Sequence, residues 1–467
     1  MIDALRLAAA WILVWLFGIA TLAVIARAAN GRNAPAPHPG WTLGCGLLVG
    51  AFGVTVWMRL LSYAGLRFSI GAIAVPLAIA TIAIGWWNRR RLAELVKFRP
   101  SLLAPASSGP MRYLFFAILL WLALRFALLL LDIVWTPLYP WDAWIQWATK
   151  ARVWYALGQI VPFGRSDAWF AANGALFFDA SPDYPATAPL WQVWSSVALG
   201  RWDDALMNLP WWLVALALAL AVYGALRDAG ISALGAIVGA WLVSSLPLAN
   251  VHVALAGYAD LPMAVYYAVA AICVWRFATT RARADAVLAL LFAVACLTIK
   301  KPGLVWALTL VPGMVVAVAP RYATRLLGGG ATLTVFALLV LAQTHPVVLG
   351  YRLHFDFAPA WNSLLDSFFL LGNWNLLWYA VIATIIVGWN TLRAPPLEAL
   401  SAIVAAGVLF LVVVFAFTNA RDWVTDQTTI NRATLHLAPL ALVWMMLVVD
   451  GWRRRIGANA AAAPVAG

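Results

Sequence analysis

Residues 113–135, YLFFAILLWLALRFALLLLDIVW, form one apolar stretch whose only charged side chains are Arg125 and Asp132. A helix of this length is about 35 Å long, enough to cross the roughly 30 Å hydrocarbon core of a bilayer. A helix at the surface of a soluble protein would instead carry a polar face along its length. The stretch therefore predicts a transmembrane helix.

Comparable apolar runs recur along the whole chain of 467 residues, which is 64% hydrophobic and 10% charged. A soluble protein is roughly 45–50% hydrophobic and about 25% charged. These values exclude a soluble fold and predict an all-α polytopic membrane protein with about 13 transmembrane helices. The predicted spans lie near residues 9–29, 41–61, 68–87, 113–135, 209–226, 232–249, 261–278, 285–299, 303–319, 326–343, 374–391, 398–418 and 435–450.

The formal net charge of +13 does not indicate a nucleic-acid partner, because many cations cluster at the ends of apolar runs. There they act as topology signals, since Lys and Arg are enriched in inner loops. Placing the basic loop 89–112 inside puts residues 136–208 outside and each later basic cluster inside. Arg59 and Arg67 then fall on the outer side, against the rule. We expect a bacterial inner (plasma) membrane protein whose chemistry faces the periplasm.

The predicted organisation has three parts: a three-span segment with its basic inner loop (1–112), a transmembrane core (113–450) and a disordered basic inner tail (451–467). The core has outer segments at 136–208, 344–373 and 419–434. Residues 186–200 are too short to cross a membrane. They predict an interfacial helix in the large first outer loop, with its tryptophans at headgroup level.

The acidic residues are divided unequally between the two sides of the predicted membrane. Both glutamates fall in inner loops, whereas eleven aspartates fall in or beside outer segments. The five histidines are scattered, and the three cysteines lie in predicted spans without metal-ligand spacing. Neither a hydrolase triad nor an HExxH motif is present. Acid chemistry therefore faces outward, and no metal site is predicted from the sequence.

Five short motifs occur in the predicted core. The first outer loop opens with LYPWDAWIQWATKARVWYALGQIVPF (138–163), in which Asp142 begins a helical stretch and Lys150 and Arg152 follow. DYPATAPLWQVW (183–194) comes next, and NLPWW (208–212) leads into the following span. GYADLP (257–262) and TIKKPG (298–303) lie at later outer ends of spans.

The order and sidedness of these motifs resemble the GT-C superfamily of polyprenyl-phosphate-sugar-dependent glycosyltransferases, particularly the protein O-mannosyltransferase and lipid A aminoarabinose transferase branch. The resemblance covers residues 113–450. The family's paired acidic residues correspond here to the single Asp142 followed by Ala143, and its HPP or KPP segment to DYP at 183–185. The resemblance implies a GT-C-like fold and an inverting transfer of a sugar from a polyprenyl-phosphate carrier to a lipid, glycan or protein acceptor outside. The other expected partners are membrane lipids, with no nucleic acid.

The resemblance also implies roles for individual residues. Asp142 is the expected catalytic base or acceptor-orienting carboxylate. The expected substrate-binding residues are Asp183, Tyr184, Asp260, Lys150 and Arg152. Lys300, Lys301 and Arg432 are expected to converge on the donor phosphate, since all three lie at outer ends of spans. No cofactor is firmly expected, and assistance by a divalent cation (Mg²⁺ or Mn²⁺) stays open.

Each of these residues also has a plainer interpretation. Asp142 could cap a helix, Asp183 and Asp260 could be turn residues, and the lysines could extend from helix ends toward water. The whole protein could be a secondary transporter, or a lipid-binding membrane protein without catalysis.

Overall fold

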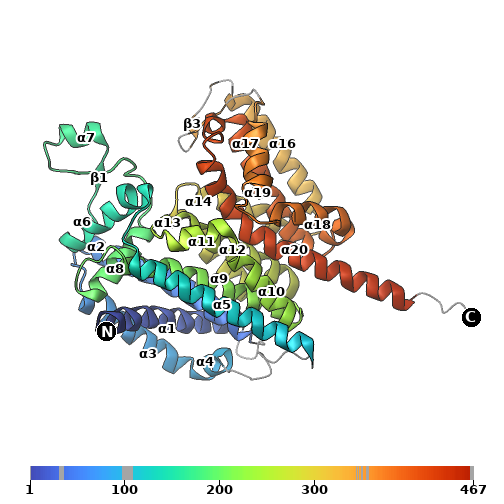
Figure 1. Ribbon diagram of the computed structural model, residues 1–467, viewed down its shortest axis with the longest axis horizontal. Coiled ribbons are helices and arrows are strands. Elements are labelled where there is room, and N and C mark those ends of the chain that lie inside the picture. The colour runs from blue at the N-terminus through green and yellow to red at the C-terminus, as the bar shows by residue number, and fades with distance from the viewer. Residues whose placement is uncertain are drawn as a thin grey trace, which may run out of the picture. The chain divides into compact units, whose positions relative to one another are not determined.

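The computed structural model describes residues 2–30, 36–96, 109–342, 344, 347–348, 351–353 and 357–462, and these are almost entirely helical (Figure 1). The basic residues Lys97 and Arg99 of the predicted inner loop lie outside the described residues. The chain divides into two compact units. Unit 1 comprises Met1–Ser245, Ala249–Tyr266 and Val294–Gly303, and unit 2 comprises Leu246–Leu248, Tyr267–Ala293 and Leu304–Gly467.

Unit 1 contains the predicted N-terminal spans, the first outer loop and the spans that follow it. Its long helices are α1 (Ile2–Asn30), α2 (Pro39–Tyr63), α3 (Ile70–Trp87), α5 (Pro110–Trp135) and α9 (Leu209–Asp228). Its shorter elements are α4 (Arg89–Val96), η2 (Ala143–Ala148), α6 (Thr149–Leu157), β1 (Phe163–Gly164), α7 (Ser166–Ala171), β2 (Phe177–Phe178), α8 (Thr187–Leu199), η3 (Leu206–Asn208), α10 (Ala233–Ser244) and α11 (Pro247–Ala254). The start of α12 (Asp260–Thr280) and the end of α13 (Arg283–Ile299) complete it.

Glycines allow α1, α2 and α9 to pack with their backbones in contact. A Cβ added at Gly18 of α1 would lie 1.8 Å from the carbonyl oxygen of Gly46 on α2. One at Gly50 would lie 1.9 Å from the carbonyl oxygen of Val14, and one at Gly224 of α9 would lie 2.0 Å from the backbone nitrogen of Trp41. Small residues of this kind let membrane helices approach closely. We refer to these contacts as the glycine seam.

The predicted helix at residues 186–200 is present as α8, but its surroundings differ from the prediction. Trp191 and Trp194 are fully buried in protein instead of facing lipid headgroups. The indole nitrogen of Trp191 donates a hydrogen bond to the carbonyl oxygen of Ala51 on α2, at 2.8 Å. Contacts with α1, α2, α6 and α9 cover this helix, so it forms part of the core of unit 1.

The predicted span at 232–249 is interrupted, because α10 and α11 meet at an angle of 62°. Pro247 begins α11 and cannot donate a backbone hydrogen bond to α10. Asn250 donates instead from its side chain to the carbonyl oxygen of Ser244 at 3.0 Å, and it accepts from Arg125 on α5 at 3.2 Å. Polar side chains therefore satisfy the broken end of α10.

Unit 2 holds the remainder of α12 and α13 and the C-terminal helices. Its other elements are α14 (Gly303–Leu308), α15 (Leu310–Val318), α16 (Ala323–Ala342), β3 (Val347–Val348), β4 (Tyr351–Arg352), α17 (Trp361–Leu365), η4 (Asp366–Leu370), α18 (Leu377–Leu392), α19 (Leu397–Phe417), η5 (Asn419–Trp423) and α20 (Thr428–Ala462). Within this unit α15 and α20 both pack against α19, and α18 packs against α20.

The helices agree with a multi-pass membrane protein. Among the described residues, eight helices are long and apolar enough to cross a membrane, or up to nine if α10 and α11 form one bent span. The predicted spans at 303–319 and 374–391 correspond to shorter apolar helices, Gly303–Val318 and Leu377–Leu392. Those at 285–299 and 326–343 correspond to α13 and α16. The count of 13 spans stays a prediction.

The tail expected to be disordered begins as helix. The last long helix, α20, continues without interruption from the predicted span through Ala462. Arg453, Arg454 and Arg455 therefore stand on a regular helix, where Arg454 pairs with Asp450 one turn earlier at 2.7 Å. Residues 463–467 lie outside the described residues.

Candidate functional site

The helix that opens the first outer loop carries Asp142 in its first turn and continues into the π-helical segment η2 and then α6. The Asp142 side chain is half-buried and makes no capping hydrogen bond. Residues Ala143–Ala148 form a π-helical turn, and just after it the hydroxyl of Thr149 donates to the carbonyl oxygen of Trp144 at 2.6 Å. Such turns are rare in proteins, and many of those that occur lie at functional sites.

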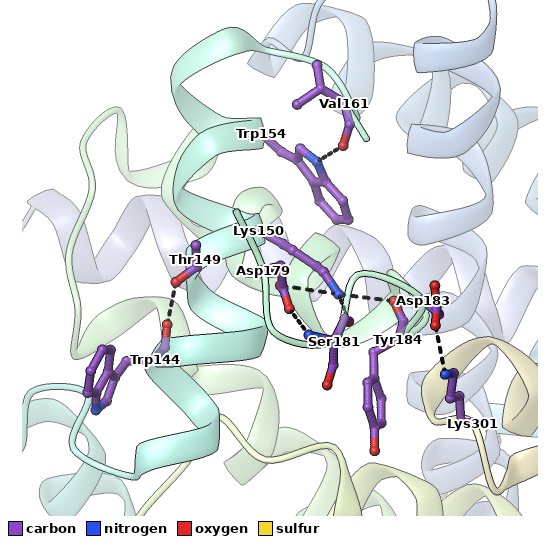
Figure 2. A network of polar contacts seen from close by, with 10 residues as sticks. All are labelled: Trp144, Thr149, Lys150, Trp154, Val161, Asp179, Ser181, Asp183, Tyr184 and Lys301. Carbon is purple, nitrogen blue, oxygen red and sulfur yellow. Dashed lines mark hydrogen bonds and ion pairs between the residues drawn. The ribbon is translucent and has the colours of Figure 1, made fainter. Parts of the chain in front are cut away.

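Lys150 is buried at the centre of the loop and holds it together (Figure 2). Its ammonium group donates to the backbone oxygens of Ser181 at 2.8 Å and Tyr184 at 3.4 Å. It also pairs with the fully buried carboxylate of Asp179 at 3.4 Å. The backbone N–H of Ser181 donates to the same carboxylate at 2.6 Å. Lys150 therefore fixes the path of residues 179–184.

Burial alters the titration of both members of this pair. Loss of hydration lowers the pKa of Lys150 and raises the pKa of Asp179, because each charged form is less well solvated inside the protein. The opposite charge of the partner counteracts both shifts. Removal of one partner would leave the other as an isolated buried charge.

Asp183 is exposed and accepts hydrogen bonds from two cations. Lys301 approaches its carboxylate at 3.0 Å (Figure 2). Arg165 approaches the same carboxylate at 3.2 Å. The hydrogen bond from Lys301, followed by its positive charge, lowers the pKa of Asp183. The start of the DYP segment and the TIKKPG segment are thus in direct contact.

Aromatic rings lie beside this ion pair. The ammonium of Lys301 is 5.7 Å from the ring centroid of Tyr184, within cation–π range. The ring of Trp147 contacts Tyr184 edge-on, with centroids 5.1 Å apart. The buried indole N–H of Trp147 has no hydrogen-bond acceptor among the described residues. An unsatisfied donor of this kind costs free energy that a bound hydroxyl would recover.

The lysines of TIKKPG have different partners. Lys300 forms a buried ion pair with Asp260 at the start of α12, whereas Lys301 reaches Asp183 in the loop. Both predicted phosphate-binding lysines therefore contact predicted substrate-binding carboxylates. Lys300 and Asp260 neutralise each other inside the protein, so Lys301 is the more accessible cation.

The GYADLP loop packs against the segment that carries Asp142. Gly257 has a φ of +115° and lies so close that an added Cβ would be 2.6 Å from the Cβ of Ala143. The indole of Trp211 donates to the carbonyl oxygen of Tyr258 at 2.6 Å and fixes the same loop. A small hollow is lined by residues 133, 136–140, 208 and 254–256, which do not include Asp142.

The remaining predicted residues lie elsewhere. Arg152 is exposed and stacks on Trp202, 5.0 Å from its ring centroid, on a different helical face from Lys150. The buried ammonium of Lys150 contacts protein oxygens, and its predicted role in binding substrate stays a prediction. Arg432 belongs to α20 in unit 2, and its convergence with the lysines stays a prediction.

The sequence alone indicated no role for Asp179 or Arg165. The sequence signal that could have found Asp179 is its position four residues before Asp183 in the same loop as Lys150. No group of three or more His, Cys, Asp or Glu side chains in the described part of the chain is arranged to hold a metal ion.

Comparison with protein-family models, with curated proteins and with solved structures finds no match. The fold by itself defines the class: an all-α, multi-pass membrane protein. Any more particular assignment depends on the chemistry of the residues described above.

Proposed function

We propose that this protein is an inverting glycosyltransferase with a GT-C-like fold that moves a sugar from a polyprenyl-phosphate carrier to an acceptor on the periplasmic side of a bacterial inner membrane. The observation that carries the proposal is the contact between Asp183 and Lys301 beside Tyr184 and Trp147. These residues come from motifs that are far apart in the sequence. A carboxylate, a cation and aromatic rings are the groups that bind a sugar phosphate.

In this proposal Asp142 orients the acceptor hydroxyl and accepts its proton as the oxygen attacks the anomeric carbon. The bond between the anomeric carbon and the phosphate oxygen breaks at the same time, and the polyprenyl phosphate leaves as a stable anion. No general acid is needed for such a leaving group, but a nearby cation stabilises it. Lys301 supplies that cation, and the partly exposed ring of Tyr184, which the buried ring of Trp147 supports edge-on, is a surface on which a sugar ring can stack.

The buried groups support this site indirectly. Lys150 and Asp179 hold the DYP segment in place, and the pair of Lys300 and Asp260 joins α13 to the GYADLP loop. Because Gly257 in that loop contacts Ala143, these pairs also constrain the position of Asp142. Small displacements at such a site lower the rate strongly.

The test is transfer from polyprenyl-phosphate sugars by the purified full-length chain, measured as release of polyprenyl phosphate. Asp142→Asn should lower transfer by at least about 100-fold, the low end for losing a general base. Folding should be kept, because the Asp142 side chain makes no capping hydrogen bond that the substitution could remove. Asp167→Asn, an exposed residue of the same loop, is the matched control and should transfer at the parental rate.

A folded Asp142→Asn protein that transfers sugar at the parental rate would rule out Asp142 as the base. A chain that binds the carrier and transfers none of a panel of sugars would favour the non-catalytic alternative.

Secondary transport is a second candidate, favoured by the break between α10 and α11. Interrupted helices with polar side chains at the break are common in transporter binding sites. Arg125 and Asn250 lie at this break. Under this alternative Asn250→Leu would abolish solute uptake into vesicles, whereas Asp142→Asn would leave uptake intact.

A further inference from the structure

Arg59, near the end of α2, is a partly buried cation whose partners are neutral. Its guanidinium donates to the hydroxyl of Thr55 at 2.8 Å and to the hydroxyl of Thr187 at 2.8 Å. Thr187 in turn donates to the hydroxyl of Thr298 at 3.0 Å. A guanidinium has five N–H groups, and these two bonds use two of them.

The charge of Arg59 is not balanced by the surrounding protein. No Asp or Glu among the residues that the structure describes forms an ion pair with it. The four cations of the site described above do form such pairs, namely Lys150, Arg165, Lys300 and Lys301. Partial burial of an unpaired charge costs free energy that an incoming anion would offset.

The hydrogen bonds of Arg59 connect it to both segments of the candidate site. Thr187 follows Asp183 by four residues, and Thr298 precedes Lys300 by two. The predicted topology also places Arg59 at the outer end of its span. Basic residues are uncommon on that side of a membrane, so we expect a cation there to have a function.

The charges of the hydrogen-bonded groups fit a doubly charged anion. The pairs Lys150–Asp179 and Lys300–Asp260 are neutral, and Asp183 with its two cations has a net charge of +1. Arg59 adds a second positive charge. A phosphate monoester carries about 1.5 to 2 negative charges at neutral pH and offers three acceptor oxygens.

We infer that Arg59 binds the phosphate group of a lipid monophosphate at the outer membrane surface, held in position by Thr55 and Thr187. The identity of the lipid as a polyprenyl phosphate rests on the proposed function. Arginine suits this task because its planar guanidinium forms paired hydrogen bonds with phosphate oxygens. The helices α2 and α8 and the end of α13 together supply this site.

The experiment measures binding to the purified full-length chain in lipid nanodiscs. The probes are a polyprenyl monophosphate, the polyprenol with the same tail, and inorganic phosphate. Arg59→Gln should weaken binding of the monophosphate by about tenfold or more, as expected for losing hydrogen bonds to a charged group. Binding of the polyprenol should not change. Arg67→Gln, an exposed residue beyond the same helix, is the matched control and should bind both probes as the parent does.

Two further variants keep the test decisive if Arg59→Gln does not fold. Arg59→Lys keeps the charge and loses the paired geometry, and Thr187→Val removes one hydroxyl that positions the guanidinium. Both should weaken binding of the monophosphate several-fold and leave that of the polyprenol unchanged. Parental affinity in both variants would overturn the inference. Competition by inorganic phosphate at the same concentration as the lipid would overturn the assignment to a lipid.

Binding and catalysis can fail separately. A chain that binds the monophosphate through Arg59 but transfers no sugar would support this inference and contradict the proposed function. If the protein transfers sugar and its Arg59→Gln variant binds the monophosphate normally, the proposed function is supported and this inference is contradicted.

Discussion

Lys301 and Asp183 are 118 residues apart in the sequence, yet the ammonium of the lysine lies 3.0 Å from the carboxylate of the aspartate. This ion pair joins the end of α13 to the first outer loop. Asp183 and Lys301 are both partly accessible, so the pair adds little to stability but places two charged groups in reach of a ligand.

Exchanging the two residues tests whether Lys301 acts by pairing with Asp183 or by stabilising the leaving phosphate. The double variant Asp183→Lys with Lys301→Asp keeps an opposite-charge pair but loses the pairing with Arg165. Because these groups are partly exposed, its thermal unfolding should stay close to that of the parent. Sugar transfer should remain as low as in Lys301→Gln, because the cation is no longer where the leaving phosphate needs it. Unfolding measured by tryptophan fluorescence and transfer in the same preparation provide the comparison. Recovery of transfer in the double variant would mean that Lys301 acts only by pairing.

The buried pair of Lys150 and Asp179 should respond differently from the exposed one. Lys150→Met leaves Asp179 as an unpaired buried carboxylate and should lower the free energy of unfolding by about 3–5 kcal/mol. Adding Asp179→Leu removes the stranded charge and should recover much of that loss. Denaturation of the purified variants in one detergent gives the measurement. If the double variant is no more stable than Lys150→Met, the carboxylate is not the source of the loss.

The titration of Asp183 sets a pH range for the exposed pair. Its pKa in the folded protein is lowered below the ordinary value of 3.8, chiefly by the hydrogen bond from Lys301. The stabilisation is thus fully present above that value and is lost as the pH falls through the lowered pKa. The ratio of parental to Asp183→Asn transfer rates should be constant from about pH 5 to 8. A change in this ratio near neutral pH would mean that a group other than Asp183 titrates in the transfer reaction.

The sidedness of the chain can be tested with thiol reagents, because Cys45, Cys273 and Cys296 are all buried and give little background. Cysteines introduced singly at the exposed positions Ser166 and Ala458 should differ. An impermeant reagent added to intact cells should label only the first. Labelling at Ala458 would mean that the predicted topology is inverted and that residues 136–208 do not face the periplasm.

The sequence predicted the apolar helices well, because hydrophobic length is a local property. It also selected Asp183 and Lys301, but their contact depends on the packing of segments that no local pattern relates. The neighbouring lysines show the limit most clearly. Lys300 and Lys301 look equivalent in the sequence, and only the end of α13 directs one inward to Asp260 and the other to Asp183.

The tryptophans of α8 illustrate a second limit. Their pattern is typical of a headgroup-level helix, but that pattern does not distinguish a helix covered by lipid from one covered by other helices. The bond from Trp191 to Ala51 shows that protein covers this one. Asp179 was missed for a related reason, because the burial that makes it important comes from Lys150 and the folded loop.

The glycine seam restricts where a lipid can travel. Between α1 and α2, and between α2 and α9, backbone atoms touch at Gly18, Gly50 and Gly224, so no acyl or prenyl chain can slip between these helices. Under the proposed function, a long-tailed donor would therefore reach the loop that carries Asp142 along another surface. The sides of α3 and α5 are largely open, and under the proposed function they are the surfaces along which a carrier would enter and its spent phosphate would depart.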